Sequence, residues 1–184
     1  KYDLEFALTP EINYSILPRP HFQVKDVIIF NNTGDFQKEL AEVKKIKIYL
    51  FQDNFFKKKK LKIKSIELFE ANFFFNKFDV PFIKNFLENG FEGKPLNIKR
   101  AKLFYQDTDG STISFLKLKK VNMAHNYNIN QNVLTSVGDI YNIPFNISWK
   151  QDLTKSEQIT NIKFKKIKLQ ILNFTKLIEE KKNK

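Results

Sequence analysis

The sequence predicts a mainly β protein, folded as a curved, largely antiparallel sheet that forms an elongated U-shaped groove with one or two short helices. Three observations support this prediction. The chain has 20 Phe and many Ile among its 184 residues, and both residue types favour strands. Apolar and polar residues alternate over many short segments, which is typical of strands with one buried face. Helical spacing of apolar residues is rare. The length fits a single module spanning residues 1–184, which we interpret as a fragment of a longer chain.

A strand motif of the form apolar-x-apolar-Lys-x-apolar-x-apolar recurs along the chain. Copies begin at Phe22, Leu61 and Leu96, and a weaker fourth copy begins at Ile162. The starts lie 39, 35 and 66 residues apart, and such a period predicts an elongated, stacked architecture. Within each copy the alternation slips by one residue, which a β-bulge can absorb while bending the strand. The motif therefore predicts bent strands and a curved sheet.

Partner strands are expected between the copies. Their predicted ranges are 43–51, 72–75, 103–107, 112–118, 133–141, 144–149 and 158–172. In the first of these, Ile46, Ile48 and Leu50 share one face. The dipeptide Asp109-Gly110 lies between two of these strands and predicts a hairpin turn.

Helices are expected at few places. The best candidate covers 79–90, where Asp79 can cap the first turn, Pro81 suits that turn and Gly90 suits the stop. Its apolar residues share one face at helical spacing. Shorter helical segments are expected at 37–42 and from residue 173 onward. So little helix leaves much of an apolar sheet face to be covered in another way.

Charge and composition narrow the possible functions. The net charge is +12, but two of the 32 basic residues are arginines, Arg19 and Arg100. Sequence-reading nucleic-acid proteins rely on the forked guanidinium of Arg, so a lysine-rich chain favours anionic surfaces such as lipid headgroups instead. The absence of Cys excludes disulfides and thiolate metal sites. No stretch approaches the roughly 20 apolar residues of a spanning helix.

Residues able to carry catalysis are sparse and scattered. His21 and His125 are the two histidines, and neither has a carboxylate at metal-ligand spacing. Asp107 and Asp109 suit a turn better than a catalytic pair. With five glycines there is no phosphate-binding loop. We therefore predict a protein that is not an enzyme and that uses no metal or cofactor.

The candidate site is an apolar stripe on the predicted strands. Its residues can form either a dry protein core or the lining of a groove for acyl chains, and the scarcity of covering helices favours the groove. Acyl chains would enter for the reason that side chains become buried, at about 25 cal/mol per Å² of apolar surface. The expected lining residues are Val24, Val27, Ile29, Ile46, Ile48, Leu50, Ile63, Ile66, Leu68, Ile98, Leu103 and Phe115, with Phe22, Leu61, Leu96 and Ile113 in the same stripe.

A basic run is formed by Lys57, Lys58, Lys59 and Lys60, directly after Phe55 and Phe56. A solvated hairpin loop explains it most simply. The functional interpretation is attraction to anionic headgroups, at about 1 kcal/mol per lysine near a charged surface.

An ordered set of segments resembles the N-terminal region of AsmA-like proteins, which are related to TamB and to bridge-like lipid transporters. The segments are 13–21 with its Leu17-Pro18-Arg19-Pro20 turn, then 22–27, 40–51, 61–71 and 98–121. The resemblance implies an inner-membrane anchor preceding residue 1 and a periplasmic body. It also implies phospholipid or other acyl lipids as partners, and a role in phospholipid transport to the outer membrane and in the assembly of that membrane.

Two other functions remain open on the sequence alone. Basic strands rich in Phe can bind single-stranded nucleic acid by base stacking. Exposed sheet edges can serve a structural scaffold of the cell envelope.

Overall fold

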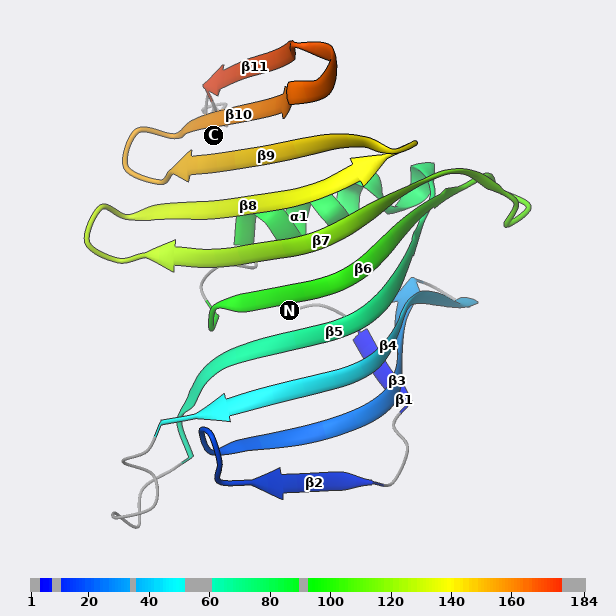
Figure 1. The fold of residues 1–184 in the computed structure, drawn as a ribbon, viewed down its shortest axis with the longest axis vertical. Helices are drawn as coiled ribbons and strands as arrows, with labels where there is room; N and C mark the ends of the chain where they lie inside the picture. The colour runs from blue at the N-terminus through cyan, green and yellow to red at the C-terminus, as the bar shows by residue number, and fades with distance from the viewer. Residues whose placement is uncertain (1–3, 8–10, 34–35, 52–60, 90–92, 177–184) are drawn as a thin grey trace, which may run out of the picture.

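All strands of the computed structural model belong to one sheet (Figure 1), within the residues that it describes: 4–7, 11–33, 36–51, 61–89 and 93–176. The predicted mainly β, curved, largely antiparallel fold is confirmed. The eleven strands are β1 (Leu4–Ala7), β2 (Ile12–Ser15), β3 (His21–Thr33), β4 (Phe36–Leu50), β5 (Ile63–Phe75), β6 (Leu96–Gln106), β7 (Thr112–Asn126), β8 (Gln131–Ile140), β9 (Ile143–Asp152), β10 (Glu157–Phe164) and β11 (Leu169–Lys176).

Strand order in the sheet follows the chain almost without exception. The path runs from β1 through β3 to β11 in sequence order, and β2 pairs with β3 beside β1. Most neighbours are antiparallel and joined by short turns, whereas β5 and β6 are parallel. Parallel neighbours need a crossover, because the chain must return to the end at which it started. Here the 3-10 turn η2 (Lys77–Asp79) and helix α1 (Val80–Asn89) form that crossover.

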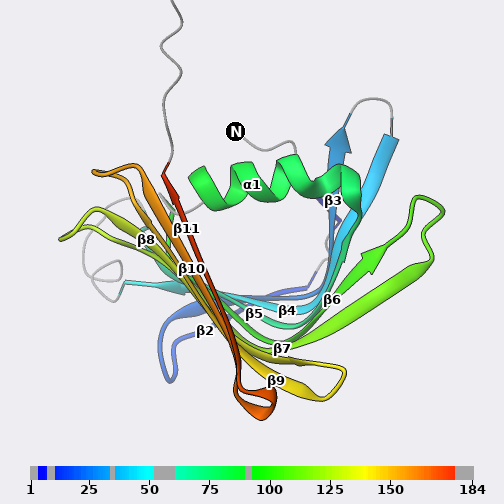
Figure 2. The ribbon, with the colours of Figure 1, turned by 90° about the horizontal axis from the view of Figure 1, so that it is seen from above.

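A sharp crease crosses the sheet from β3 to β6. Asp26, Glu70 and Arg100 have positive φ values of 49°, 55° and 55°, and the pairing on either side of them aligns the three in one row. Because each crease residue is inserted into the alternation, residues three apart point to the same face. In β3 these are Val24 and Val27. Seen from above, the sheet folds into a trough with α1 lying across its concave side (Figure 2).

The best-buried side chains lie at this crease. Val27, Val43 and Ala71 are each 1% exposed, and the neighbouring Ala101 is 3% exposed. Val27 pairs with Val43, and Val43 pairs with Ala71. A sheet bent this sharply brings the concave side chains on the two arms together, so small residues fit there.

The predicted bends occur in the first three copies of the strand motif. Asp26 bends the first copy and Arg100 the third. In the second copy the pairing skips Lys64, as the alternation predicts. A further bend at Glu70 was not predicted, because it lies beyond the eight-residue motif.

Three predicted elements are wrong. The fourth motif copy and the predicted strand 158–172 form a hairpin instead, because 3-10 turn η4 (Lys165–Ile167) and Lys168, at φ 54°, reverse the chain between β10 and β11. The segment 37–42 is part of β4, not a helical turn. Residues 173–176 end β11, and the rest of the helix predicted from 173 lies outside the described residues.

Helix α1 is confirmed, but its cap differs from the prediction. Asn76, not Asp79, is the N-cap of the preceding turn, and its side chain accepts a hydrogen bond from Phe78 N. Asp79 completes a capping box by accepting from Asn76 N at 2.7 Å, and it also pairs with Lys38 of β4. Asp79 therefore fixes the start of α1 to the sheet. The predicted stop at Gly90 lies outside the described residues.

Replacing Asp79 with alanine should lower the free energy of unfolding by about 1–2 kcal/mol, since a cap and a buried ion pair are lost together. Urea titration monitored by circular dichroism measures the change. The control is Lys77→Ala in the same turn, where we expect a change within about 0.5 kcal/mol. Equal losses in the two variants would show that the Asp79 contacts do not hold the helix.

Candidate functional site

Two continuous rows of side chains run across the strands on the concave face, which we call the apolar strip. Residues paired across antiparallel or parallel neighbours share a face, so the pairing places the members of each row side by side. The first row is Ile12, Val24, Ile46, Leu68, Ile98, Val121, Ser136, Ile147, Ile162 and Ile171. The second row is Tyr14, Phe22, Ile48, Ile66, Leu96, Met123, Leu134 and Trp149.

The strip follows the long axis of the molecule, perpendicular to the strands. Its first row joins ten strands, so it covers nine interstrand steps of about 4.8 Å, or about 43 Å in all. The strip's ends are exposed: Ile12 is 60% and Ile171 is 46% exposed, whereas Leu68 and Ile98 near the middle are 8% exposed. The apolar surface thus continues past the well-buried middle in both directions.

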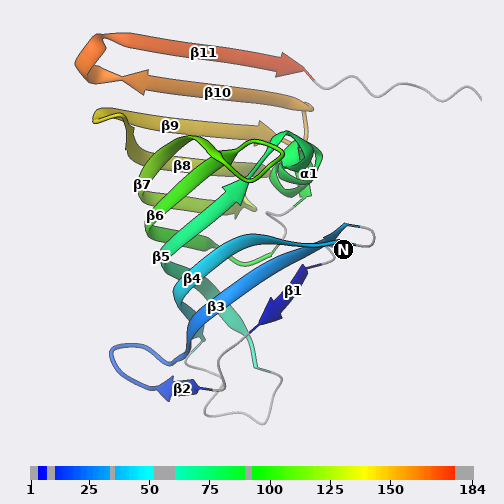
Figure 3. The same ribbon diagram turned by 90° about the vertical axis from the view of Figure 1, so that its right-hand side faces the viewer.

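Helix α1 crosses the strip as a strap. Figures 1 and 3 show it beside β7, β8 and β9, and Figure 2 shows its axis running at an angle to the last strands across the concave side. Its Phe86 and Leu87 pack against the buried cluster of the sheet. A helix about 10 Å wide can cover about two interstrand steps, so it leaves most of the strip's length without a helix over it.

A cavity of about 480 Å³ lies between the helix and the last strands. It is lined by Val80, Ile83, Lys84 and Leu87 of α1 and by Trp149, Gln158 and Thr175 of the sheet. Its volume is within the range of small-molecule sites. The cavity places Trp149 of the apolar strip next to an open space on the concave side.

Eleven of the twelve predicted lining residues lie on the concave face. Five of them are buried within the chain itself, namely Val24, Val27, Leu50, Leu68 and Ile98. The other six are half-buried: Ile29, Ile46, Ile48, Ile63, Ile66 and Leu103. The alternation found this face correctly because the crease preserves it on both sides.

Phe115 lies on the opposite, outer face, so its assignment to the lining is wrong. It pairs with Phe104, which follows the concave Leu103 and therefore points the other way. Ile113, also in the predicted stripe, is 58% exposed, and the β6–β7 pairing skips it where the register shifts between Tyr105 and Gln106. The error arose because both faces of β7 are apolar near its start. The predicted headgroup residues Lys57, Lys58, Lys59 and Lys60 lie outside the described residues, as do Phe55 and Phe56.

A polar row borders the strip on strands β7 to β9, and the sequence analysis missed it. Asn132 and Gln151 are 2% and 4% exposed, and Asn132 Nδ2 donates to Gln151 Oε1 at 2.9 Å. A ring nitrogen of His125, Nδ1, lies 2.8 Å from Asn132 Oδ1. In the strip itself the buried Ser136 Oγ has no hydrogen-bond partner among the described residues. The sequence signal that could have revealed this row is the alternation of amide side chains with apolar residues along these strands.

The outer face is charged where it crosses the crease. A hollow of about 540 Å³ there is lined by Asp26, Lys44, Glu70 and Arg100, among others. Glu70 pairs with Lys44 at 3.1 Å and with Arg100 at 3.5 Å. The hydrogen bond from Lys44 is the main cause that lowers the pKa of Glu70 from its ordinary 4.5. Because these charges largely neutralise one another, the hollow offers a ligand little unpaired charge.

The described residues include no helix that is both long and apolar enough to cross a membrane.

The fold and the strip define a class of protein: an open, curved β-sheet whose apolar concave face is crossed by one helix. Neither a known family model nor a curated protein matches the chain.

Proposed function

We propose that this chain is a lipid-binding module of an AsmA-like envelope protein, whose concave strip holds acyl chains during phospholipid transport to the outer membrane. Its place is a periplasmic body attached to the inner membrane. The observation that supports this most is the length of the apolar strip, about 43 Å along the long axis at about 4.8 Å per strand. One helix covers only a part of it, and the strip's end residues stay exposed.

The proposal follows from the cost of exposed hydrocarbon. Each Å² of apolar surface left in water costs about 25 cal/mol, and an acyl chain laid along the rows removes that cost over several strands. The contacts are dispersive and non-directional, so chain selectivity is low. No catalytic step and no cofactor are part of the function.

Mass spectrometry of lipid extracted from the purified chain tests the proposal. We expect acyl lipid to co-purify, and we expect recovery to fall at least about tenfold in the double variant Ile48→Asp/Ile63→Asp, because a carboxylate in hydrocarbon is strongly unfavourable. The matched control is Lys47→Asp/Ser65→Asp, on the outer face of the same two strands. Unchanged recovery in the folded concave variant, or an equal fall in the control, would contradict the proposal.

A second variant guards against loss of folding. Ile12 belongs to the strip but is 60% exposed, so Ile12→Asp should fold normally while still reducing lipid recovery. Trp149, the single tryptophan, supplies an independent signal. Lipids brominated on the acyl chain should quench its fluorescence, whereas lipids brominated on the headgroup should not. Binding of single-stranded DNA without co-purified lipid would favour the nucleic-acid alternative instead.

A further inference from the structure

A row of aromatic side chains lies on the outer face at one end of the strands, on the side of the sheet opposite the apolar strip. The rings of Phe74 and Phe104 are 5.4 Å apart and nearly parallel, and Phe104 lies 5.9 Å from Phe115. Ile113, 58% exposed, lies two residues before Phe115 in β7, and Phe115 is 38% exposed. We call Phe74, Phe104, Ile113 and Phe115 the aromatic patch.

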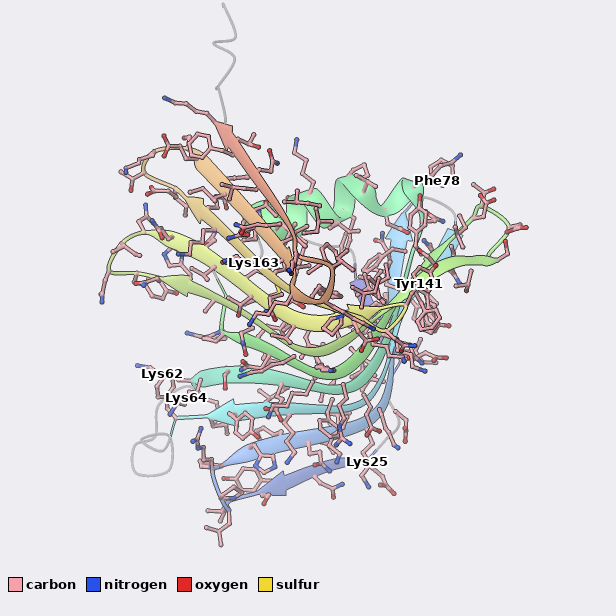
Figure 4. All side chains as sticks on the ribbon, turned by 45° about the horizontal axis from the view of Figure 1, so that its top comes forward. Lys25, Lys62, Lys64, Phe78, Tyr141 and Lys163 are labelled. Atoms are coloured by element: carbon pink, nitrogen blue, oxygen red, sulfur yellow. The ribbon has the colours of Figure 1, made fainter. Side chains whose placement is uncertain are left out.

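Further exposed aromatic side chains lie at the same end of the sheet. Phe78 is 69% and Tyr141 is 66% exposed. Figure 4 shows both at the end of the strands away from Lys62 and Lys64. Tyr141 lies two residues beyond Asp139, which pairs with Lys117 of β7. So many exposed large side chains at one end mark an interaction surface.

Cations lie directly behind the patch on the same face. Lys102 and Lys117 pair across β6 and β7, each two residues from a phenylalanine of the patch. Lys99 and Lys120 form the next pair. On this outer face of β5 to β8, Lys99, Arg100 and Lys117 form ion pairs with Glu67, Glu70 and Asp139, and Lys102 and Lys120 add two further positive charges. The surface behind the aromatic patch is therefore positively charged.

The distance between the aromatic patch and the lysines behind it matches the depth to which apolar groups enter the surface of a lipid bilayer. Two residues along a strand span about 7 Å, and apolar groups at membrane surfaces insert about 5–10 Å. When the aromatic patch enters the acyl region, the ammonium groups of Lys102 and Lys117 reach the level of the phosphates. Stacking between Phe74 and Phe104 occupies one face of each ring, which leaves fewer free faces for the base stacking that single-stranded nucleic acid needs.

We propose that the aromatic patch and the lysines behind it dock this end of the protein onto an anionic lipid surface. The partner is a bilayer carrying anionic headgroups. Because the patch and the apolar strip lie on opposite faces, docking is independent of acyl-chain binding in the strip, and each can fail without the other.

Vesicle flotation tests this docking with phosphatidylcholine vesicles that contain or lack phosphatidylglycerol. We expect the intact chain to float with the phosphatidylglycerol vesicles. Ile113→Ser/Phe115→Ser should weaken binding about tenfold through lost apolar contact. Lys102→Gln should weaken it about fivefold, as expected for one lysine at a charged surface. Circular dichroism confirms that the variants are folded.

Matched controls lie on β11 and β10. Leu172 and Phe174 are 65% and 60% exposed on the outer face, so Leu172→Ser/Phe174→Ser removes similar apolar surface far from the patch. Lys163→Gln is the matched charge control. Equal weakening in these controls would overturn the proposal, as would unchanged flotation of the patch variants. The proposal would also be overturned if the patch variants bound vesicles like the intact chain but lost binding to a single-stranded oligonucleotide. Lipid co-purification should not change in any patch variant.

Discussion

Gly138→Ala should destabilise the protein by about 3 kcal/mol, which for a chain of this length lowers the melting temperature by about 10 °C. A β-carbon at this position would lie 2.1 Å from the Lys117 carbonyl oxygen and 2.8 Å from Cζ of Phe145. Gly138 pairs with Leu118 and Phe145, and the β7–β8 register shifts directly beyond Leu118. Both a strand backbone and an aromatic ring would have to move.

Thermal unfolding monitored by circular dichroism measures this effect, and Gly110→Ala is the control. A β-carbon at Gly110 meets no atom within 4 Å, so only its φ of +87° opposes the substitution, at a cost of about 1 kcal/mol. Comparable losses in the two variants would mean that the close approach at Gly138 relaxes without cost. That result would contradict the tight β7–β8 packing described above.

Ala71→Leu should cost about 2–3 kcal/mol because the crease has no space for a larger side chain. Ala71 is 1% exposed and pairs with Val43, itself 1% exposed. Three added carbon atoms must push the two arms of the bent sheet apart or force strained rotamers. Urea unfolding measures the loss, and a flatter sheet should also release Phe86 and Leu87 of α1 from the buried cluster.

The matched control for the crease is Ala124→Leu. Ala124 is half-buried and lines a hollow of about 490 Å³ together with His125, Tyr127 and Val133. The same enlargement should therefore change stability by no more than about 0.5 kcal/mol. A crease variant as stable as this control would show that the small residues at the bend are not required for the fold.

The alternation of apolar and polar residues predicted most of the sheet because it is set locally by the pleat. Ile46, Ile48 and Leu50 lie on the concave face as their spacing requires. Local patterns failed where both faces of a strand are apolar, as at Phe115, and where one residue reverses the chain, as at Lys168. The parallel pairing of β5 with β6 could not be predicted from the sequence either, because it depends on the end of the sheet at which the crossover brings the chain back.

The candidate site was predictable in its residues but not in its extent. The motif identified the bends at Asp26 and Arg100, yet their alignment into one crease depends on the register of four strands. The polar row through Asn132 and Gln151 also depends on strand register. These two amides come from different strands and form a hydrogen-bonded pair only after the strands align.

The crossover helix is held at both ends, since its chain leaves β5 on one side and enters β6 on the other. Because its Phe86 and Leu87 also pack against the buried cluster, the helix divides the concave side into two stretches, and an acyl chain of the proposed ligand could not push it aside as it could a free arm. The connection that makes two parallel strands possible would thus also limit how far one acyl chain of the proposed ligand can extend along the concave side.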